Sequence, residues 1–256
     1  AFNGEVYNHF ILRRELGAVS WRGHSDTETL LTSFDEWGIQ GAVERVVGMF
    51  AFAVWDKSED TLVLGRDRIG EKPLYYGWQG NSFLFGSELK ALKQHPTFEN
   101  NINRGALSLQ LRHNCIPAPY SIYEGISKLL PGRLLKVSLQ NRVPHEWAYW
   151  SGIEKTKSLV ANSFIGNSDE AVDELEVLLK DSVRQQMMAD VPLGAFLSGG
   201  IDSSIVVALM QAQSSLPVKT FTIGSYEKGY NEAVHAKEVA KHLGTDHTEL
   251  YVTADQ

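Results

Sequence analysis

The sequence predicts two domains of different fold class: an α+β domain with antiparallel sheets in residues 1–150, and an α/β domain with a parallel sheet in residues 168–256. Short apolar segments separated by polar turns dominate the first part, which is typical of antiparallel strands. Apolar strands alternate with helical segments in the second part, which indicates a parallel sheet. Residues 151–167 are rich in Ser, Asn, Lys and Gly, so we interpret them as an interdomain linker.

Composition and charge narrow the class of protein. The 256 residues are 43% hydrophobic and carry a formal net charge of -7, which disfavours a non-specific nucleic-acid surface. The longest apolar run, residues 46–55, is too short to span a bilayer. A single cysteine excludes an internal disulfide and suits a reducing cytosol. We therefore expect a cytoplasmic protein with no nucleic-acid or membrane partner.

Four apolar segments of the first domain are predicted to be consecutive antiparallel strands. Residues 49–56 and 61–67 flank the polar turn KSED, and residues 72–78 and 82–88 flank the turn QGN. Helical patterns are expected at 26–37 and 88–93, and residues 116–138 form a proline-broken stretch that ends in another strand. A charged cluster near a turn, for which a structural salt-bridge network is expected, contains Arg66, Asp67, Arg68 and Lys72.

The second domain begins with a helix that carries its own start signal. Asn167 and Glu170 form a plausible capping box. Apolar residues then recur at helical spacing, namely Val172, Leu175, Leu179, Val183 and Met187. A strand (193–197), a glycine-rich loop, a helix (203–213), a strand (218–223), a helix (231–243) and a strand (247–252) follow.

The loop between the strand at 193–197 and the next helix reads SGGIDSS, residues 198–204. Ligands bind at the carboxyl ends of parallel strands, and a helix N-terminus attracts anions. Gly199 and Gly200 let the backbone approach a phosphate closely, and hydroxyl donors come from Ser198, Ser203 and Ser204. The loop lacks the lysine of the common P-loop and has Asp202 instead, which implies Mg²⁺ between carboxylate and phosphates. The alternative is a glycine-rich turn with Ser and Asp as helix caps.

This loop resembles the pyrophosphate-binding loop of N-type ATP pyrophosphatases, which cleave ATP between the α- and β-phosphates. The segments NGEVYNHFILRREL, HSDTETLL, GMFAFAVWD, RDRIGEKPLYY and FGSELKAL resemble the class II glutamine amidotransferase domain of glutamine-hydrolysing asparagine synthetases. IPAPYSIYEGISKLLPG, DVPLGAFLSGGIDSS, KTFTIG and LGTDHTEL continue that resemblance. It implies an Ntn-hydrolase-like fold for the first domain and an ATP pyrophosphatase fold for the second.

The resemblance assigns roles to particular residues of the first domain. Amide hydrolysis passes through an oxyanion that needs preorganised donors, and the family's Asn-Gly pair, here Asn3 and Gly4, forms that oxyanion hole. The resemblance also implies that Asn3, Gly4, Glu5 and Asp26 bind glutamine. Asp26 would bind the α-amino group of the glutamine substrate. Taken alone, Asn3-Gly4 is more typical of a type I′ hairpin turn. Asp26 taken alone is also consistent with a helix cap over Glu28 and Thr29.

In the second domain, the resemblance implies binding of ATP and Mg²⁺. Ser198, Gly199, Gly200, Asp202, Ser203 and Ser204 would hold pyrophosphate, with Asp202 on Mg²⁺, while Leu197 and Ile223 would contact the adenosine. The implied reaction is the amidation of aspartate to asparagine by glutamine-derived ammonia, through β-aspartyl-AMP and pyrophosphate. Two alternatives stay open: amidation of another carboxylate, such as a sugar acid or a β-lactam precursor, and a non-catalytic nucleotide-binding scaffold.

The sequence departs from the family pattern at both ends. The family's nucleophile is an N-terminal cysteine, whereas this chain starts at Ala1. We therefore expect that the sequence is incomplete at both ends and that the polypeptide as written does not hydrolyse glutamine. The expected partners are glutamine, aspartate and ATP, and a homodimer is left open.

Overall fold

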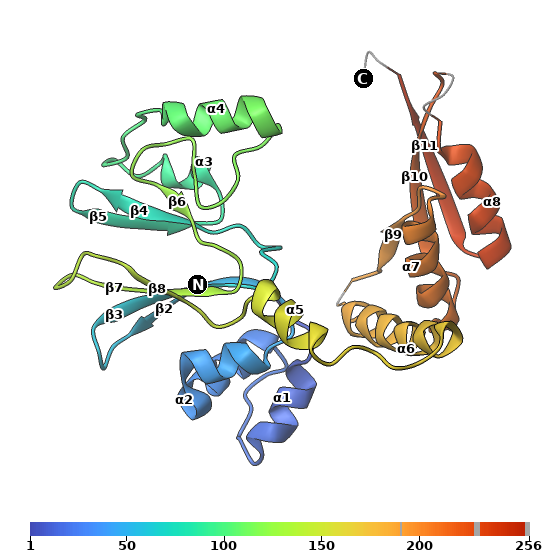
Figure 1. Cartoon of the computed structure of the whole chain (residues 1–256), viewed down its shortest axis with the longest axis horizontal. Coiled ribbons are helices and arrows are strands. Elements are labelled where there is room, and N and C mark those ends of the chain that lie inside the picture. The colour runs from blue at the N-terminus through green and yellow to red at the C-terminus, as the bar shows by residue number, and fades with distance from the viewer. Residues whose placement is uncertain (190, 228–230, 254–256) are drawn as a thin grey trace. The chain divides into compact units, whose positions relative to one another are not determined.

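The structure is a computed structural model that describes residues 1–189, 191–227 and 231–253. The chain forms two compact units, Ala1–Ser163 and Phe164–Gln256, and each is described by itself (Figure 1). The boundary between them lies inside the predicted linker. No helix among the described residues is long and apolar enough to cross a membrane.

Two antiparallel sheets form the framework of the first unit. The five-stranded sheet has the order β1-β2-β3-β7-β8, with β1 Phe2–Val6, β2 Gly48–Asp56, β3 Thr61–Arg66, β7 Arg133–Ser138 and β8 His145–Ala148. The three-stranded sheet has the order β5-β4-β6, with β4 Tyr75–Gln79, β5 Ser82–Gly86 and β6 Ser127–Lys128. All four predicted strands are present, but they form two hairpins that belong to different sheets.

Five helices accompany these sheets in the described part of the unit: α1 His9–Leu16, α2 Asp26–Arg45, α3 Leu89–Leu92, α4 Arg104–His113 and α5 Gly152–Val160. Helix α2 continues past its predicted end at Trp37, across a kink at Gly38 where φ is 70°. Glycine adopts this backbone angle without steric cost, so the chain turns and resumes the helix. Helix α5 lies in the stretch that we interpreted as a linker, where Ser151 caps it.

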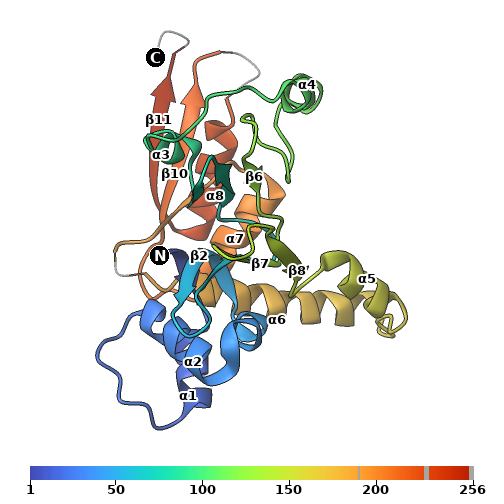
Figure 2. The same cartoon turned by 90° about the vertical axis from the view of Figure 1, so that its left-hand side faces the viewer.

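The first unit has three layers, which Figures 1 and 2 show from two directions: the pair α1 and α2, the five-stranded sheet, and the three-stranded sheet. One core cluster, with Leu12, Leu30 and Phe50, joins α1 and α2 to the five-stranded sheet. A second cluster, with Leu64 and Leu135, fills the space against Tyr76, Trp78 and Phe83 of the three-stranded sheet. The α+β class predicted for this domain is confirmed.

Two glycines allow β1 and β2 to approach each other unusually closely. A Cβ atom on Gly4 would lie 2.1 Å from the carbonyl oxygen of Met49, and one on Gly48 would lie 2.1 Å from that of Glu5. Real side chains do not tolerate such contacts, so both positions require glycine. Asn3 and Gly4 therefore lie inside strand β1, and the alternative of a type I′ hairpin turn is wrong.

In the described part of the chain, the charged cluster that begins at the end of β3 braces a loop through backbone groups and not through salt bridges. The buried carboxylate of Asp67 accepts hydrogen bonds from the N–H groups of Phe50, Gly70, Glu71 and Lys72. The guanidinium of Arg66 donates to the carbonyls of Gly70, Lys72 and Leu129. The predicted ion-pair network is therefore replaced by side chains that satisfy buried backbone donors and acceptors.

The second unit contains a parallel three-stranded sheet of order β11-β10-β9, which confirms the α/β prediction. Its strands are β9 Gly194–Phe196, β10 Lys219–Ser225 and β11 Asp246–Val252, and its helices are α6 Ser168–Gln186, α7 Ile201–Ala212 and α8 Ala233–Leu243. The predicted capping box is confirmed: Asn167 accepts from the N–H of Glu170, whose carboxylate accepts from the N–H of Asn167.

Helices α7 and α8 pack on one face of this sheet. Val207 of α7 and Ala236 and Ala240 of α8 form a core with Leu197 at the end of β9. Along β10 the side chains alternate, with Thr220 and Thr222 buried under this layer. Leu197 and the loop that follows it are thereby fixed between the sheet and two helices.

Candidate functional site

The antiparallel register turns the backbone N–H of Gly4 to the open edge of β1. Ala1 and Ala53 exchange two hydrogen bonds of 2.9 Å, and the N–H of Tyr7 donates to the carbonyl of Val47. Hydrogen-bonded and non-hydrogen-bonded pairs alternate in such a ladder. The backbone N–H and C=O groups of Asn3 and Glu5 therefore point toward β2. The N–H groups of Gly4 and Val6 consequently point away from β2, and β1 is the edge strand of the sheet.

Asp26 lies on the same edge, although it is twenty residues from β1. Its Oδ2 accepts a hydrogen bond of 2.9 Å from the N–H of Val6. The N-cap of α2 is Ser25, whose hydroxyl accepts from the N–H of Thr27, so the alternative of Asp26 as the cap is wrong. Val6 follows Gly4 by two residues, which places the two N–H groups about 7 Å apart along the strand. A carboxylate and an N–H donor thus share one strand edge.

This edge has the chemistry to hold an amino acid with a polarised side-chain carbonyl. The Asp26 carboxylate offers a charge-assisted acceptor for an ammonium group. The N–H of Gly4 offers a fixed dipole to an oxygen that gains negative charge. In glutamine, the amide carbon is separated from the α-amino nitrogen by two methylene groups and the α-carbon, which suits two groups spaced along a strand.

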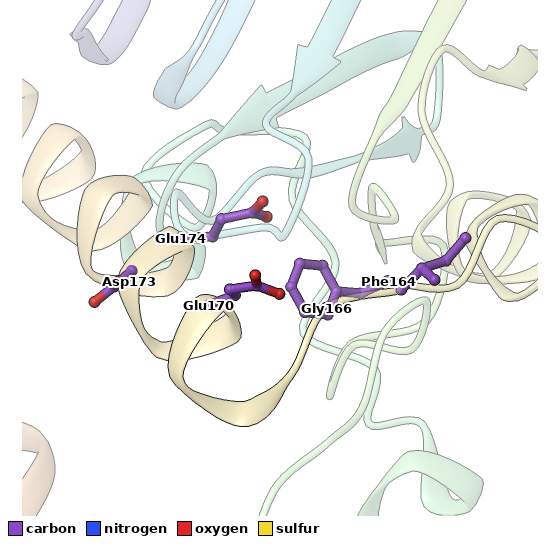
Figure 3. A pocket seen from close by; sticks show the side chains of 6 residues that line it. Phe164, Gly166, Glu170, Asp173 and Glu174 are labelled. Atoms are coloured by element: carbon purple, nitrogen blue, oxygen red, sulfur yellow. The ribbon is translucent and has the colours of Figure 1, made fainter.

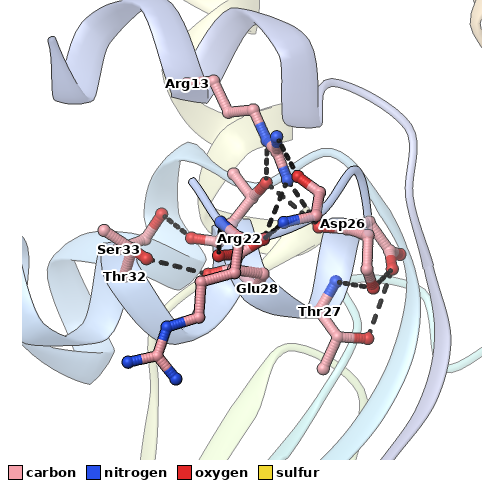
Figure 4. Close-up of polar contacts among 10 residues, drawn as sticks. Arg13, Arg22, Asp26, Thr27, Glu28, Thr32 and Ser33 are labelled. Carbon is pink, nitrogen blue, oxygen red and sulfur yellow. Dashed lines mark hydrogen bonds and ion pairs between the residues drawn. The ribbon is translucent and has the colours of Figure 1, made fainter. Parts of the chain in front are cut away.

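Arg13 of α1 holds the loop that leads into Asp26, a role that sequence reasoning missed (Figure 4). Its Nη1 and Nη2 donate to the carbonyls of Gly23 and Ser25, both at 2.9 Å, and its Nε donates to Thr29 Oγ1 at 2.7 Å. The same guanidinium lies over the ring of Trp21. Five donors in a rigid fork allow one arginine to bind all these acceptors at once.

Glu28 completes this loop from the first turn of α2. Its carboxylate accepts from the N–H of Arg22 at 2.7 Å and of Gly23 at 2.9 Å, and it lies 3.6 Å from Arg13 (Figure 4). The hydrogen bond from the Arg22 N–H is the main cause that lowers the pKa of Glu28. The hydrogen bond from Gly23 and the positive charges of Arg13 and Arg22 also lower this pKa, whereas burial raises it. The sequence contains no local signal for either Arg13 or Glu28, because both act on a loop that only the fold brings to them.

The side chains of Asn3 and Glu5 lie on one face of β1, since residues two apart share a face. Asn3 Nδ2 donates to Ser87 Oγ, which follows β5, at 2.9 Å. Burial raises the pKa of Tyr7 to about 12, and the nearby carboxylates of Glu71, Glu5 and Asp67 add to this effect. The phenol of Tyr7 is therefore a neutral neighbour of the site at physiological pH.

In the second unit, the glycine-rich loop lies where two helices begin. Gly200 is the N-cap of α7. Gly199 has a φ of 79°, and a Cβ atom there would lie 2.8 Å from the backbone nitrogen of Ala236, in the first turn of α8. Only glycine permits this approach, and it brings two helix N-termini to one loop. The N–H of Ala233, the first residue of α8, already donates to Asn231 Oδ1, so the N–H groups and dipole at the start of α7 are what favour an anion at this place.

The loop hydroxyls bind within the loop itself. Ser198 Oγ lies 2.9 Å from Ser203 Oγ and accepts from the N–H of Gly200 at 3.3 Å. Ser204 Oγ donates to the carbonyl of Gly200 at 2.7 Å. Each hydroxyl hydrogen rotates easily. A bound anion could therefore accept hydrogen bonds from these hydroxyls in place of the contacts that they make within the loop.

Asp202 differs from the serines because no hydrogen bond or ion pair within the described residues engages its carboxylate. It is exposed in the first turn of α7. No group of three or more His, Cys, Asp or Glu side chains in that part of the chain is arranged to hold a metal. A single free carboxylate nevertheless fits Mg²⁺, which commonly takes one or two carboxylates and completes its shell with water and substrate phosphates.

Leu197 and Ile223 lie on neighbouring strands at the base of the loop. The N–H of Leu197 donates to the carbonyl of Phe221 at 2.9 Å, and the buried Thr222 hydroxyl donates to the carbonyl of Leu197. Leu197 is only 1% exposed as a residue, whereas Ile223 is 59% exposed. Sequence reasoning missed Thr222, whose contact joins residues that are far apart in the chain.

A separate hollow of about 560 Å³ lies at the start of α6 and contains none of the predicted site residues (Figure 3). It is lined by Phe164, Ile165, Gly166, Glu170, Asp173 and Glu174. Glu170 is already engaged in the capping box. The carboxylates of Glu170, Asp173 and Glu174 would repel an anion in this hollow. The loop at 198–204 is therefore the better candidate for an anion site.

Comparisons with known proteins give each part of the chain a family match. Residues 1–150 match the family described as glutamine amidotransferase domain, and residues 174–256 match the family described as asparagine synthase. A putative glutamine-hydrolysing asparagine synthetase 2 of Methanocaldococcus jannaschii is 36% identical over 253 residues, which cover 98% of this chain and 47% of that protein. The glutamine-hydrolysing asparagine synthetase 3 of Bacillus subtilis is 39% identical over 238 residues, 89% of this chain and 36% of that protein.

Asparagine synthetase B of Escherichia coli is 30% identical and is covered over 42% of its length, so this chain spans less than half of these relatives. Among solved structures, the glutamine phosphoribosylpyrophosphate amidotransferase of Bacillus subtilis, complexed with ADP and GMP, matches with a TM-score of 0.45 and 12% identity, over 100% of this chain and 70% of that one. The match to residues 1–150 covers more than half of the chain, which therefore belongs to the glutamine amidotransferase domain family, while its residues 174–256 match the asparagine synthase family model.

Proposed function

We propose that the natural protein containing this chain amidates aspartate to asparagine, with glutamine as nitrogen donor and ATP as energy source. The observation that carries this proposal is the pairing, in one chain, of two family matches with two matching sites: a strand edge suited to glutamine and a lysine-free phosphate loop. The relatives named above support glutamine as the nitrogen donor.

In the first unit, the proposed reaction is hydrolysis of the glutamine amide. Asp26 binds the α-ammonium group, and Glu5 contributes to the same glutamine site. The N–H of Gly4 and the amide of Asn3 donate to the oxyanion of the tetrahedral intermediate. The family resemblance assigns the nucleophile to an N-terminal cysteine, which the present 256 residues do not include. The reaction converts glutamine and water into glutamate and ammonia.

In the second unit, the loop at 198–204 holds the β- and γ-phosphates of ATP. A β-carboxylate oxygen of aspartate attacks the α-phosphorus, the bond to the bridging oxygen of the β-phosphate breaks, and pyrophosphate leaves. Mg²⁺, held by Asp202 and the phosphates, would neutralise the charge that gathers on pyrophosphate. Ammonia then attacks the acyl carbon of β-aspartyl-AMP, so that AMP leaves with the former carboxylate oxygen. Leu197 and Ile223 contact the adenosine.

Product analysis tests this proposal. The natural protein, supplied with aspartate, glutamine and Mg-ATP, should form asparagine, glutamate, AMP and pyrophosphate in equal amounts. Oxygen label placed in the β-carboxylate of aspartate should appear in AMP. Formation of ADP and phosphate would exclude the pyrophosphatase chemistry, and turnover with another carboxylic acid in place of aspartate would identify a different acceptor. Absence of ATP turnover with every acceptor would leave a nucleotide-binding scaffold.

A further inference from the structure

The hydrogen bond between Asn3 and Ser87 links the two sheets of the first unit at the candidate oxyanion site. Asn3 is paired with Ala51, and paired residues share a face of the sheet. Ala51 belongs to the cluster that packs against Tyr76, Trp78 and Phe83 of the three-stranded sheet. The side chain of Asn3 therefore lies on the face that this second sheet covers.

Ser87 comes from that second sheet, directly after β5. Its Oγ accepts a hydrogen bond of 2.9 Å from Asn3 Nδ2, across 84 residues of sequence. A primary amide has two N–H donors on one nitrogen, and within the described residues only this one is engaged. The bond thus restricts the side-chain torsions of Asn3 and leaves the second donor for another acceptor.

We propose that Ser87 is a positioning residue for glutamine hydrolysis: it holds the Asn3 amide so that the free N–H of Nδ2 meets the developing oxyanion. This inference rests on the proposed function of the first unit. Oxyanion donors contribute in proportion to how well they are oriented before the reaction. Without this hydrogen bond, the Asn3 side chain would rotate freely and would have to be ordered during each turnover.

The kinetic test compares Ser87→Ala, Ser87→Thr and a control, Ser82→Ala, in the natural protein. Ser82 begins the same strand, and its side chain makes no hydrogen bond in the described structure. Ser87→Ala should lower kcat for glutamine roughly five- to tenfold with little change in KM, because the lost interaction belongs to the transition state. Ser87→Thr retains the hydroxyl and should restore most of the rate. Synthesis from ammonium salts should be unchanged in all three.

A double-mutant cycle separates positioning from a general structural effect. If Ser87 acts through Asn3, Ser87→Ala should have no further effect on kcat in an Asn3→Ala background. Additive losses, or a Ser87→Ala rate equal to that of the parent protein, would overturn the inference.

The bond itself is checked without turnover. The side-chain amide signals of Asn3 in a ¹⁵N-labelled sample should shift in Ser87→Ala and stay in place in Ser82→Ala. If the parent protein released no ammonia from glutamine, the proposed function would fail while these signals still reported the contact. Unshifted signals would show that the contact is absent, whatever the activity.

Discussion

The Oδ2 of Asp26 accepts a hydrogen bond from the backbone N–H of Val6 at 2.9 Å. This contact joins the first residue of α2 to the open edge of β1, where the N–H of Gly4 points in the same direction. The carboxylate consequently has one oxygen fixed by the strand, while its position at a helix N-terminus stabilises its negative charge. A substrate ammonium would complete a charge-assisted contact with a group that is already oriented.

Asp26→Asn should raise the KM for glutamine at least roughly tenfold, because the amide keeps an acceptor for Val6 but loses the charge that attracts the ammonium. Steady-state glutaminase assays of the natural protein measure this, with Asp35→Asn on the same helix as the matched control. Ammonia-dependent synthesis should stay unchanged. An unaltered KM would remove Asp26 from the glutamine site.

Arg13→Lys should loosen the loop before Asp26, since a lysine ammonium cannot reach the carbonyls of Gly23 and Ser25 and the hydroxyl of Thr29 together. Hydrogen exchange at the amides of Arg22 and Gly23 should accelerate, and the KM for glutamine should rise several-fold. Arg14→Lys is the control, because within the described residues the Arg14 side chain donates only to the carbonyl of Phe10 in its own helix. Equal exchange rates in the two variants would contradict the assigned role of Arg13.

Glu28 should make the same loop sensitive to acid. Its folded-state pKa is lowered, first by the hydrogen bond from Arg22. A lowered pKa means that the stabilisation is fully present above the ordinary glutamate value of about 4.3 and is lost as the pH falls through the folded value below it. The amide shifts of Arg22 and Gly23 should therefore follow a titration below about pH 4.3, and Glu28→Gln should abolish it. Titration of these amides in that variant would assign the transition to another group.

The second unit was predicted well because its signals are local. A capping box, strand–helix alternation and a glycine-rich loop each lie within a few residues, and each element formed as the pattern indicated. The capping contacts of Asn167 and Glu170 follow directly from neighbouring residues, and α7 begins at Ile201, two residues before its predicted start at 203. In this unit, residues that are close in sequence determine the local structure.

The first unit shows why other parts were not predicted. Asn3-Gly4 has the local preference of a turn, but Gly4 is required by the approach of Met49 from another strand. Asp26 has the local preference of a cap, but Ser25 takes that place and frees the carboxylate for Val6. The contacts of Ser87 and Arg13 depend on which loops the fold brings together. Residue types therefore pointed to the candidate site, whereas its supporting contacts required the tertiary structure.

Asp202 provides a prediction whose sign reverses with magnesium. In the parent protein we expect the exposed carboxylate to repel pyrophosphate when no cation is present and to attract it through Mg²⁺ when the ion is supplied. Asp202→Asn retains the size of the side chain and removes the charge. The variant should bind magnesium pyrophosphate at least roughly tenfold more weakly than the parent protein. In EDTA, without the ion, it should bind pyrophosphate as well as or better than the parent protein.

Isothermal titration calorimetry in both media measures this pair of affinities, and Asp173→Asn, an exposed substitution on α6, is the matched control. Glutamine hydrolysis should be unaffected by either change. Equal losses with and without Mg²⁺ would indicate that Asp202 supports the loop structurally, because a folding defect does not depend on the cation. Unchanged affinity in both media would place the magnesium ligand elsewhere and leave the anion to the backbone N–H groups where α7 begins.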